Sequence, residues 1–242
     1  MSQTEPMIQV RGLEKTFILH NQGGISLPVL RAVDFDAGPG ECLVLSGPSG
    51  TGKSTLMRCL YGNYLASGGS IRVRDGQQWV ELRGASEQRI LALRRNVIGY
   101  VSQFLRAVPR VGAVDVAAEP LRARGVPAGQ AREQAAALLA RLNLPARLFD
   151  LPPATFSGGE QQRVNIARGI IGGHPVLLLD EPTASLDAEN RAVVIALIRE
   201  AVAAGRCLIG IFHDEAVREA VATRILTLEP AAAEAPAAVL QD

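Results

Sequence analysis

Cysteine is scarce in this chain of 242 residues, which contains only Cys42, Cys59 and Cys207. Each lies in an apolar stretch, and their spacing matches no metal-binding pattern, so we expect reduced thiols in the core of an intracellular protein. Residues 1–10 contain neither the basic region nor the apolar region of a secretory signal. The longest apolar helical stretch, 192–204, is interrupted by charged residues and is too short to cross a bilayer. The sequence therefore predicts a cytoplasmic protein that reaches a membrane only through a partner.

Net charge is nearly absent as well. The chain has 25 Lys and Arg against 24 Asp and Glu, for a formal net charge of +1. It therefore lacks the basic field that attracts nucleic acid or an anionic membrane. No internal repeat at the spacing of a solenoid is present. What remains is an ordinary globular composition, with 48% hydrophobic and 20% charged residues, at a length that allows one large or two small domains.

The first third of the chain carries short β-like patterns. The expected strands are 8–10, 16–19, 29–33, 41–46, 69–74 and 78–82. A turn-rich excursion, 20–28, separates the second strand from the third. Asp75-Gly76 supplies the turn of a hairpin between the last two.

Later segments alternate between helices and apolar strands. A short helix is expected to end at 91–95, and 113–144 has helical periodicity that breaks near 125–127. Continuous apolar runs of the kind found in buried parallel strands occupy 97–102, 176–180, 207–212 and 224–228. Because helices separate these runs, the pattern predicts an α/β sheet with an inserted helical lobe. The Ala-, Pro- and Glu-rich segment 230–242 is expected to be a flexible tail.

Residues 47–54 match the phosphate-binding pattern G-x-x-x-x-G-K-[ST] at every fixed position, between an apolar strand and a helix-capable stretch. Glycines let the backbone N–H groups point at phosphate oxygens, and the positive end of the following helix adds to the attraction. Lys53 is expected to reach the β- and γ-phosphates, and the Ser54 hydroxyl to hold Mg²⁺. The predicted nucleotide-binding residues here are Gly47, Pro48, Ser49, Gly50, Thr51, Gly52, Lys53, Ser54 and Thr55.

Two acidic residues end the apolar run at 176–180. Asp180 is expected to hold Mg²⁺, directly or through water, beside Ser54. Glu181 then faces the γ-phosphate and can polarise an attacking water. An acidic helix cap after a core strand would place the same residue types here, but the phosphate loop favours the catalytic interpretation.

A second anion site is predicted at Ser157, Gly158 and Gly159, where a helix begins. The serine hydroxyl and the unpaired N–H groups of a helix start can bind an anion. Alone, this segment would indicate only a helix cap. Its position between the phosphate loop and the acidic strand end makes the prediction specific.

The order of these segments, with Gln103 and His213 among them, resembles ATP-binding cassette (ABC) ATPases across the whole chain. The resemblance implies an α/β P-loop NTPase fold with a parallel-sheet core and an N-terminal antiparallel β subdomain. It implies one domain over 1–229, with the helical lobe inserted at about 104–172. It also implies that ATP, with Mg²⁺, is hydrolysed at the interface of a homodimer or of a heterodimer with a second ABC ATPase. Segment 157–160 of one chain then binds the ATP held by the other.

Individual roles follow from the same resemblance. Gln103 contacts Mg²⁺ and senses the γ-phosphate, and Ser185-Leu186-Asp187 forms the loop that carries signals across the dimer. His213 contacts the γ-phosphate. A lone histidine at a strand end is often structural, but the strand ends of a parallel sheet gather at the ligand crevice, which favours function. Phe17 falls where an aromatic ring stacks on adenine, although a core aromatic would also fit there.

Two residues depart from the family pattern. The segment 157–163, Ser-Gly-Gly-Glu-Gln-Gln-Arg, corresponds to the signature segment of the family. Within it Glu160 replaces the usual Gln, and directly before it Phe156 replaces the usual Leu. We expect both to be tolerated, because the phosphate contact comes from Ser157 and the backbone after it, so Glu160 remains in the predicted site. His174 is expected in a loop at a strand entry, and His20 is assigned no role.

Several sequence segments, which include residues outside the nucleotide motifs, are similar to the PhnL family. PhnL is the L component of the bacterial carbon–phosphorus lyase system. The similar segments are 15–20, 29–33, 102–110, 154–169, 180–190 and 210–218. The resemblance implies an ATPase that works in phosphonate catabolism with a cytoplasmic lyase core complex and a second cassette ATPase.

A transporter ATPase, of the lipoprotein-release or exporter type, is the alternative. Its helical lobe would contact a membrane subunit, and the surface at 104–110 could receive either partner. A chromosome or DNA-repair ATPase is disfavoured because such proteins need long heptad arms. A translation factor of this family would need two cassettes in tandem, and only one is present.

Overall fold

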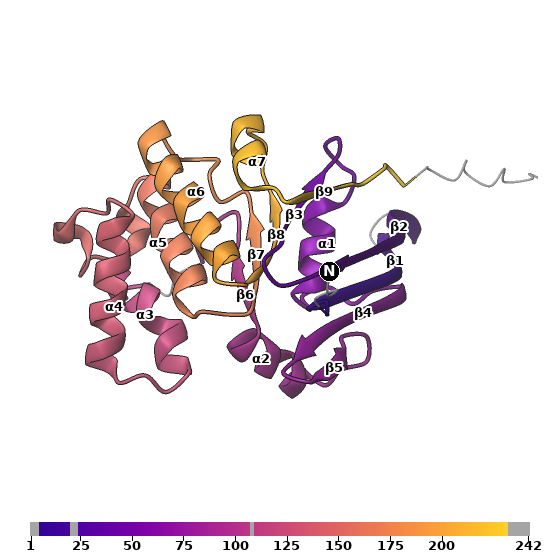
Figure 1. Cartoon of the computed structure of the whole chain (residues 1–242), viewed down its shortest axis with the longest axis horizontal. Helices are drawn as coiled ribbons and strands as arrows, with labels where there is room; N and C mark the ends of the chain where they lie inside the picture. Colours follow the sequence, from indigo (N-terminus) through magenta and orange to yellow (C-terminus); the bar gives the residue numbers. More distant parts are fainter. Residues whose placement is uncertain (1–4, 20–23, 107–108, 232–242) are drawn as a thin grey trace, which may run out of the picture.

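The computed structural model describes residues 5–19, 24–106 and 109–231, which form an antiparallel and a parallel sheet with helices around them (Figure 1). The antiparallel sheet has the order β2-β1-β4-β5 and the parallel sheet β6-β7-β8-β3-β9. The strands are β1 (Ile8–Leu19), β2 (Ile25–Ala37), β3 (Cys42–Ser46), β4 (Gly68–Asp75), β5 (Gln78–Glu81), β6 (Ile98–Val101), β7 (Val176–Asp180), β8 (Cys207–Ile211) and β9 (Arg224–Thr227). The helices are α1 (Lys53–Leu60), α2 (Glu87–Asn96), α3 (Ala113–Ala123), α4 (Ala128–Arg141), α5 (Gly158–Ile171), α6 (Ala188–Ala203) and α7 (Glu215–Val221), with 3₁₀ turns η2 (Ala146–Leu148) and η3 (Pro153–Thr155).

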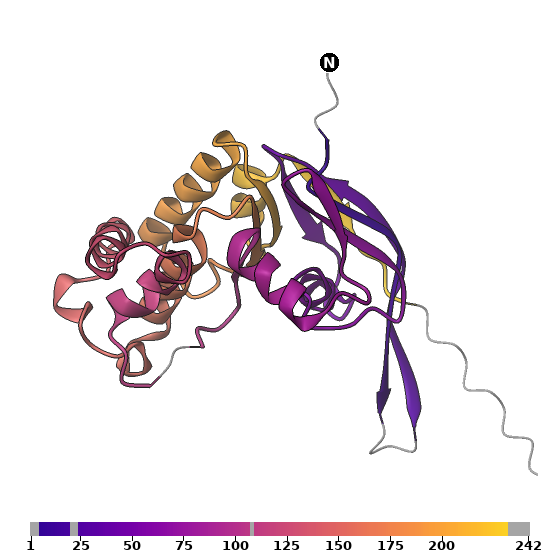
Figure 2. The ribbon, with the colours of Figure 1, turned by 90° about the horizontal axis from the view of Figure 1, so that it is seen from below.

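The antiparallel sheet contains the predicted hairpin, β4 with β5, and a longer one, β1 with β2. The prediction of a turn-rich excursion over 20–28 is wrong in its second half, because Ile25 already pairs with Leu19 and Pro28 lies inside β2. Proline is tolerated there since β2 is an edge strand. Residues 20–23 lie outside the described part. Figure 2 shows this hairpin extending as an arm from the rest of the sheet.

The parallel sheet has a hydrophobic core on each face. Along β3, Cys42 and Val44 enter one core together with residues of α5, whereas Leu43 and Leu45 enter the other together with residues of α1. This is the alternation expected of a strand covered on both sides. β7 and β8 are buried throughout, as predicted. The expectation of burial is wrong for β9, which pairs only with β3 at the sheet edge and leaves Ile225 57% exposed.

Helices α3, α4 and α5 pack on one another beside the parallel sheet. The predicted break near 125–127 is confirmed: Gly125 has a φ of 88°, and Pro127 precedes the first residue of α4. Proline suits that position because the N–H it lacks would have had no partner inside the helix. The small residues Ala117, Ala131 and Ala135 are fully buried and allow close helix packing.

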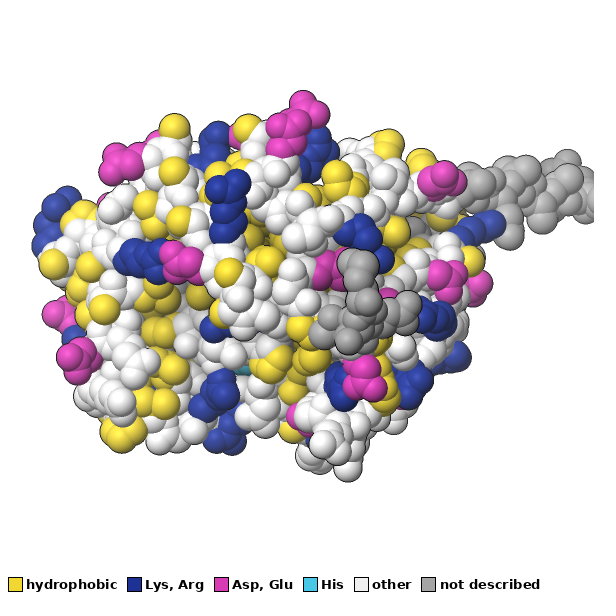
Figure 3. Space-filling model, in the orientation of Figure 1, with side chains coloured by type: hydrophobic (Ala, Val, Ile, Leu, Met, Phe, Trp, Pro, Cys, Tyr) yellow, Lys and Arg dark blue, Asp and Glu magenta, His cyan; other side chains and the backbone are white. Residues whose placement is uncertain are grey.

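The three cysteines are buried and free, as the sequence predicted. Burial raises the pKa of the Cys59 thiol to about 11 and that of Cys42 to about 12, so both remain protonated and unreactive at neutral pH. On the face shown in Figure 3, basic and acidic side chains are interspersed, in keeping with the net charge of +1. Within the described ranges, no helix is long and apolar enough to cross a membrane.

Candidate nucleotide-binding site

The phosphate loop, 47–52, connects β3 to α1. Gly47 and Gly52 have φ values of 133° and 87°, a region that strains residues with a side chain. A Cβ at Gly47 would lie 2.4 Å from the Leu228 carbonyl oxygen, and one at Gly52 would lie 2.9 Å from the Val29 oxygen. Both glycines are therefore required by the turn and by the close approach of neighbouring backbone, as the motif predicted.

Lys53, the first residue of α1, lies over this loop. Its Nζ donates hydrogen bonds to the carbonyl oxygens of Gly47, at 2.7 Å, and Pro48, at 2.8 Å. The ammonium group is thus held at the loop whose backbone is expected to surround phosphate oxygens. Thr51 is buried, and its hydroxyl donates to the Pro48 carbonyl oxygen. This hydrogen bond stabilises the conformation of the loop.

Asp180 lies next to α1 at the end of β7 and is only 3% exposed. The Ser54 hydroxyl donates to its Oδ1 at 3.4 Å, and the Tyr100 hydroxyl donates to its Oδ2 at 3.0 Å. Burial raises the pKa of this carboxyl group above its ordinary value, and the hydrogen bond from Tyr100 acts in the opposite direction. The structure therefore brings Ser54 and Asp180 together, as the sequence predicted.

The sequence did not predict that Tyr100 belongs to this site. It lies on β6, the neighbour of β7, and pairs in register with Leu178, two residues before Asp180. Burial raises the pKa of its hydroxyl, so the group remains a hydrogen-bond donor at neutral pH. The sequence did contain a signal, because a residue with a hydroxyl group inside a short apolar strand needs a polar partner when it is buried.

Glu181 is the centre of a second cluster. Its Oε1 lies 2.6 Å from Nε2 of His213, and its Oε2 accepts a hydrogen bond from Nε2 of Gln103 at 3.3 Å. These three residues follow β7, β8 and β6, so they meet at the carboxyl ends of adjacent parallel strands. Glu181 has a φ of 54°, which is uncommon for a residue with a side chain and turns the backbone directly after Asp180.

The residues next to the phosphate loop suit Mg²⁺. The hydroxyl of Ser54 and the carboxylate of Asp180 are hard oxygen ligands, and Mg²⁺ in nucleotide sites typically combines one or two such groups with phosphates and water. Among the residues that the structure describes, no group of three or more His, Cys, Asp or Glu could form an all-protein metal cage. The donor set thus fits a metal that arrives with the nucleotide. Gln103, the third predicted ligand, directs its amide nitrogen to Glu181.

The signature segment starts α5, with Ser157 as the N-cap. Both the N–H and the hydroxyl of Ser157 donate to Oε2 of Glu160, at 2.9 and 2.7 Å, and the Glu160 N–H donates back to the hydroxyl. These bonds hold the pKa of Glu160 below its ordinary value. Sequence analysis missed this capping box, although the pattern Ser-x-x-Glu is its usual signal. The Ser157 hydroxyl, one of the donors predicted to bind an anion, is therefore bonded to a carboxylate.

The signature segment contacts the residues that follow Glu181, not the phosphate loop. Gln162 on α5 is buried, and its Nε2 donates to the Pro182 oxygen at 3.1 Å. A Cβ on Gly159 would lie 3.0 Å from the Ser185 oxygen. In the described part of this chain, no hydrogen bond joins 157–160 to 47–54.

Phe17 lies on the arm of the antiparallel sheet. Its ring meets Tyr64 edge to face at a centroid distance of 5.3 Å, and Nζ of Lys15 lies 4.7 Å from its centroid. Phe17 pairs with Leu27, two residues from Val29, whose oxygen approaches Gly52. The contact of the Phe17 ring with adenine stays a prediction.

The other histidines lie outside this site. His174 follows α5 in the loop before β7, and it is buried with the pKa of its ring lowered by that burial. His20 lies outside the described residues.

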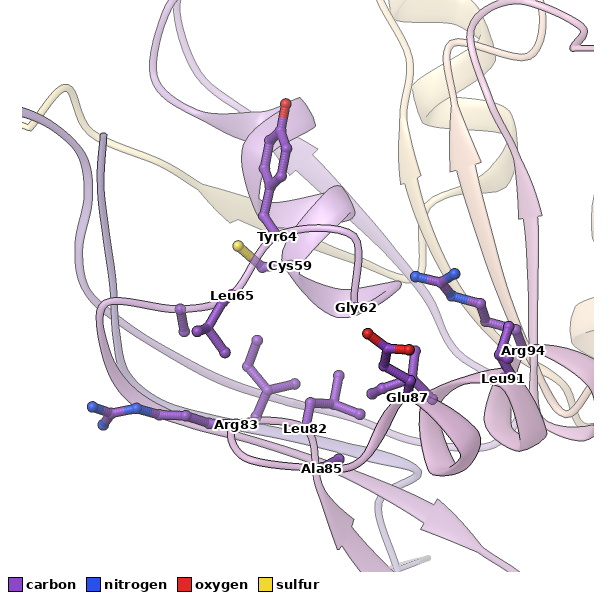
Figure 4. A pocket seen from close by; sticks show the side chains of 13 residues that line it. Cys59, Gly62, Tyr64, Leu65, Leu82, Arg83, Ala85, Glu87, Leu91 and Arg94 are labelled. Carbon is purple, nitrogen blue, oxygen red and sulfur yellow. The ribbon is translucent and has the colours of Figure 1, made fainter. Parts of the chain in front are cut away.

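A separate cavity of about 580 Å³ lies between the end of α1, the segment that follows β5, and α2 (Figure 4). The figure shows Tyr64, Leu65, Leu82 and Leu91 around it. None of the predicted nucleotide-binding residues lines this cavity.

Comparison with known proteins agrees with this geometry. The ABC transporter family matches residues 30–184. The lipoprotein-releasing system ATP-binding protein LolD of Maricaulis maris is 39% identical over 198 residues, which cover 82% of this chain and 83% of LolD. The macrolide export ATP-binding/permease protein MacB of Sodalis glossinidius is 36% identical over 214 residues. That match covers 88% of this chain but only 32% of MacB, so the chain spans about a third of this longer relative.

Among solved structures, the ATP-binding cassette MJ0796, described as a dimeric post-hydrolysis state bound to ADP and Pi, superposes with a TM-score of 0.84. It is 26% identical, and the superposition covers 92% of this chain and 94% of that one. The predicted fold, a parallel α/β core with an antiparallel β subdomain, is thereby confirmed. With the phosphate loop, the acidic strand end and the family match in agreement, the chain belongs to the ABC transporter family of ATP-binding proteins and is an ATP hydrolase.

Proposed function

We propose that this chain hydrolyses ATP at sites shared between two cassettes and uses the reaction to drive a partner protein. The observation that supports this most directly is the division of the site. Lys53, Ser54, Asp180 and Glu181 lie around one phosphate loop. In the described part of the chain Ser157 has no hydrogen bond to that loop, and α5, the helix it caps, contacts the segment after Glu181 through Gln162. A second chain can supply the missing signature segment, as the dimeric state of MJ0796 suggests.

Each residue has a definite part in the proposed reaction. Lys53 and the loop N–H groups bind the β- and γ-phosphates. Ser54 and Asp180 would hold Mg²⁺, which would supply positive charge to neutralise the phosphate oxygens. Glu181 polarises the attacking water as general base. His213 and Gln103 each bond one oxygen of this carboxylate, so they fix its orientation toward the phosphate. Ser157 of the second cassette contacts the γ-phosphate from the other side.

The partner surface lies next to Gln103. A groove of about 680 Å³ extends from Asp180 and Tyr100 to Phe104, Arg106 and Arg168. Phe104 is 73% exposed, and Arg168 donates to the Arg106 carbonyl oxygen at 3.3 Å while pairing with a glutamate of α3. A protein bound in this groove would contact the segment that follows Gln103 and could respond to the state of the nucleotide.

We propose that a transporter subunit occupies this groove. The names of the similar proteins, LolD and MacB, support this assignment, since both describe ATP-binding proteins of release or export systems. The match covers 83% of the length of LolD and 32% of the length of MacB.

A carbon–phosphorus lyase complex is the second candidate partner. The segments 102–110 and 210–218, outside the nucleotide motifs, are similar to the PhnL family and favour it. In that case the groove would receive a subunit of a cytoplasmic enzyme complex acting on phosphonates.

Affinity purification from phosphate-starved cells distinguishes the two partners. Recovery of a membrane permease, with normal growth of a deletion strain on methylphosphonate, is the result expected for the transporter. Recovery of lyase subunits, with loss of that growth, would overturn the transporter assignment in favour of the lyase.

The groove is tested by charge reversal at Arg106, which lines it, together with Arg110, which lies four residues further along the chain and does not line it. The double variant Arg106→Glu and Arg110→Glu is expected to lose the partner in the same purification, because reversed charges oppose an interface that the wild type forms. Its ATP hydrolysis as an isolated protein should equal that of the wild type. A variant that retains the partner would exclude this groove as the docking surface.

A further inference from the structure

The buried carboxylate of Asp180 has two oxygens, and the structure gives them different partners. Oδ1 faces the Ser54 hydroxyl at 3.4 Å, whereas Oδ2 accepts the hydrogen bond from Tyr100 at 3.0 Å. Asp180 is 3% exposed, so solvent has little access to replace either partner. A carboxylate held at one oxygen by a strong donor has lost most of its freedom to rotate, because a hydrogen bond to a charged group is among the stronger ones in proteins.

Tyr100 is itself firmly placed. Its ring packs against Tyr61 at a centroid distance of 4.9 Å, and Tyr61 directly follows α1. The guanidinium of Arg94, on α2, lies 4.6 Å from the Tyr61 ring centroid and donates from Nε to the Tyr61 carbonyl oxygen at 3.0 Å. The two rings are therefore held between the helix of the phosphate loop, the neighbouring strand and α2. The hydroxyl of Tyr100 has a fixed position from which to reach Asp180.

We propose that Tyr100 is a positioning residue for metal binding: its hydroxyl holds Oδ2 of Asp180 so that Oδ1 points to the place beside Ser54. Without this hydrogen bond the carboxylate can rotate, and a rigid octahedral ion such as Mg²⁺ is sensitive to that change. The proposal rests on Asp180 as the metal-holding carboxylate of the proposed function. It concerns the affinity for the metal and not the binding of the nucleotide by the phosphate loop.

The test compares Tyr100→Phe with Tyr61→Phe. Both changes remove one hydroxyl and keep the ring, but only the first removes a bond to Asp180. Binding of Mn²⁺ to the protein with ATP is measured by electron paramagnetic resonance, and binding of ATP with EDTA present is measured separately. Tyr100→Phe is expected to weaken Mn²⁺ binding about tenfold, as loss of one second-layer hydrogen bond to a metal ligand typically does. ATP binding in EDTA should equal that of the wild type, and Tyr61→Phe should match the wild type in both measurements.

Unchanged Mn²⁺ affinity in Tyr100→Phe would overturn the proposal. An equal loss of ATP binding in EDTA would also overturn it, because it would show a general structural role. Melting temperatures of the variants identify any such loss of folding. Asp180→Asn tests the underlying assignment: if it binds Mn²⁺ like the wild type, then Asp180 holds no metal, and the proposed function fails at this residue independently of Tyr100.

Discussion

The nucleotide site has two halves: the phosphate half, with Lys53 and the loop 47–52, and the signature half, with Ser157 and Glu160. The two halves differ in the groups that these side chains bind within the same chain. In the phosphate half, Lys53 donates to the carbonyl oxygens of Gly47 and Pro48, which are neutral. In the signature half, Ser157 donates twice to the carboxylate of Glu160, which is negative. A phosphate oxygen displaces neutral carbonyls readily, because hydrogen bonds between charged groups are stronger. At Ser157 it must compete with a carboxylate and is repelled by it.

This difference suggests an order of events. On the proposed function, we expect ATP to bind first at the phosphate half of one chain and the signature half of a second chain to close on it afterwards. The second step would include the cost of turning Glu160 away from Ser157. We therefore expect the phosphate half to control nucleotide affinity and the signature half to control association of the two chains.

The largest effect is expected for Glu181→Gln, within the phosphate half. The amide cannot accept a proton from water, so turnover should fall about 10²- to 10⁴-fold. Because ATP contacts the loop and Lys53, equilibrium binding of ATP should remain unchanged. Steady-state hydrolysis and a fluorescence titration with ATP check these two quantities. If the variant lost ATP binding and turnover to the same extent, Glu181 would not be the catalytic base.

Lys53→Ala and Ser157→Ala form a matched pair that separates the two halves. Loss of the Lys53 ammonium should weaken ATP binding by about 2–3 kcal/mol, or roughly 30- to 150-fold, since it removes charge-assisted bonds to phosphate. Ser157→Ala should bind ATP like the wild type as a monomer but lose ATP-dependent association. Calorimetry at low protein concentration measures the first property, and sedimentation measures the second. Weak ATP binding by Ser157→Ala would break the distinction between the halves.

A smaller effect is expected for Glu160→Gln, which keeps a side-chain oxygen near Ser157 and removes the charge. With less repulsion of the approaching γ-phosphate, ATP-dependent association should tighten by up to about fivefold, the range of an exposed charge interaction. Association of the wild type and the variant is compared at low and high salt. The difference should shrink at high salt, where the charge is screened. Weaker association of the variant at both salt concentrations would show that the carboxylate helps the dimer.

The smallest effect concerns stability and pH. Because the pKa of Glu160 is lowered in the folded protein, its ionised form stabilises the fold at pH values above the ordinary pKa of about 4.3. This stabilisation is lost as pH falls through the lowered pKa. The melting temperature of the wild type should therefore exceed that of Glu160→Gln by a small amount at pH 7, and the difference should shrink as pH falls through the lowered pKa of Glu160. If the difference in melting temperature stayed constant as pH falls, the carboxylate of Glu160 would not stabilise the helix cap.

Local patterns predicted the parts of the site that depend on chain-adjacent residues. Gly47, Gly52 and Lys53 follow from the loop motif, and the place of His213 near Glu181 follows from the gathering of parallel strand ends at one edge of the sheet, whereas Gln103 was assigned from the family resemblance. What could not be predicted depends on neighbours in space, since no local rule identifies a partner on another strand.

Tyr100 and Ile225 show this limit. The bond from Tyr100 to Asp180 arises from the register of β6 with β7, and the exposure of Ile225 arises from the position of β9 at the sheet edge. The capping bond from Ser157 to Glu160 is local. The sequence indicated a helix cap at this position, but the part of Glu160 in that cap was not predicted, because the segment was assigned to an anion site.

The central claim, that two chains share each site, is tested most directly by sedimentation velocity of Glu181→Gln. With ATP and Mg²⁺ the variant should sediment as a dimer, because ATP persists between the chains. With ADP it should sediment as a monomer, and the double variant with Ser157→Ala should stay monomeric with ATP. Two results together would contradict the account. The Glu181→Gln protein, saturated with ATP, would remain monomeric at high concentration, and the specific rate of hydrolysis by the wild type would be independent of protein concentration.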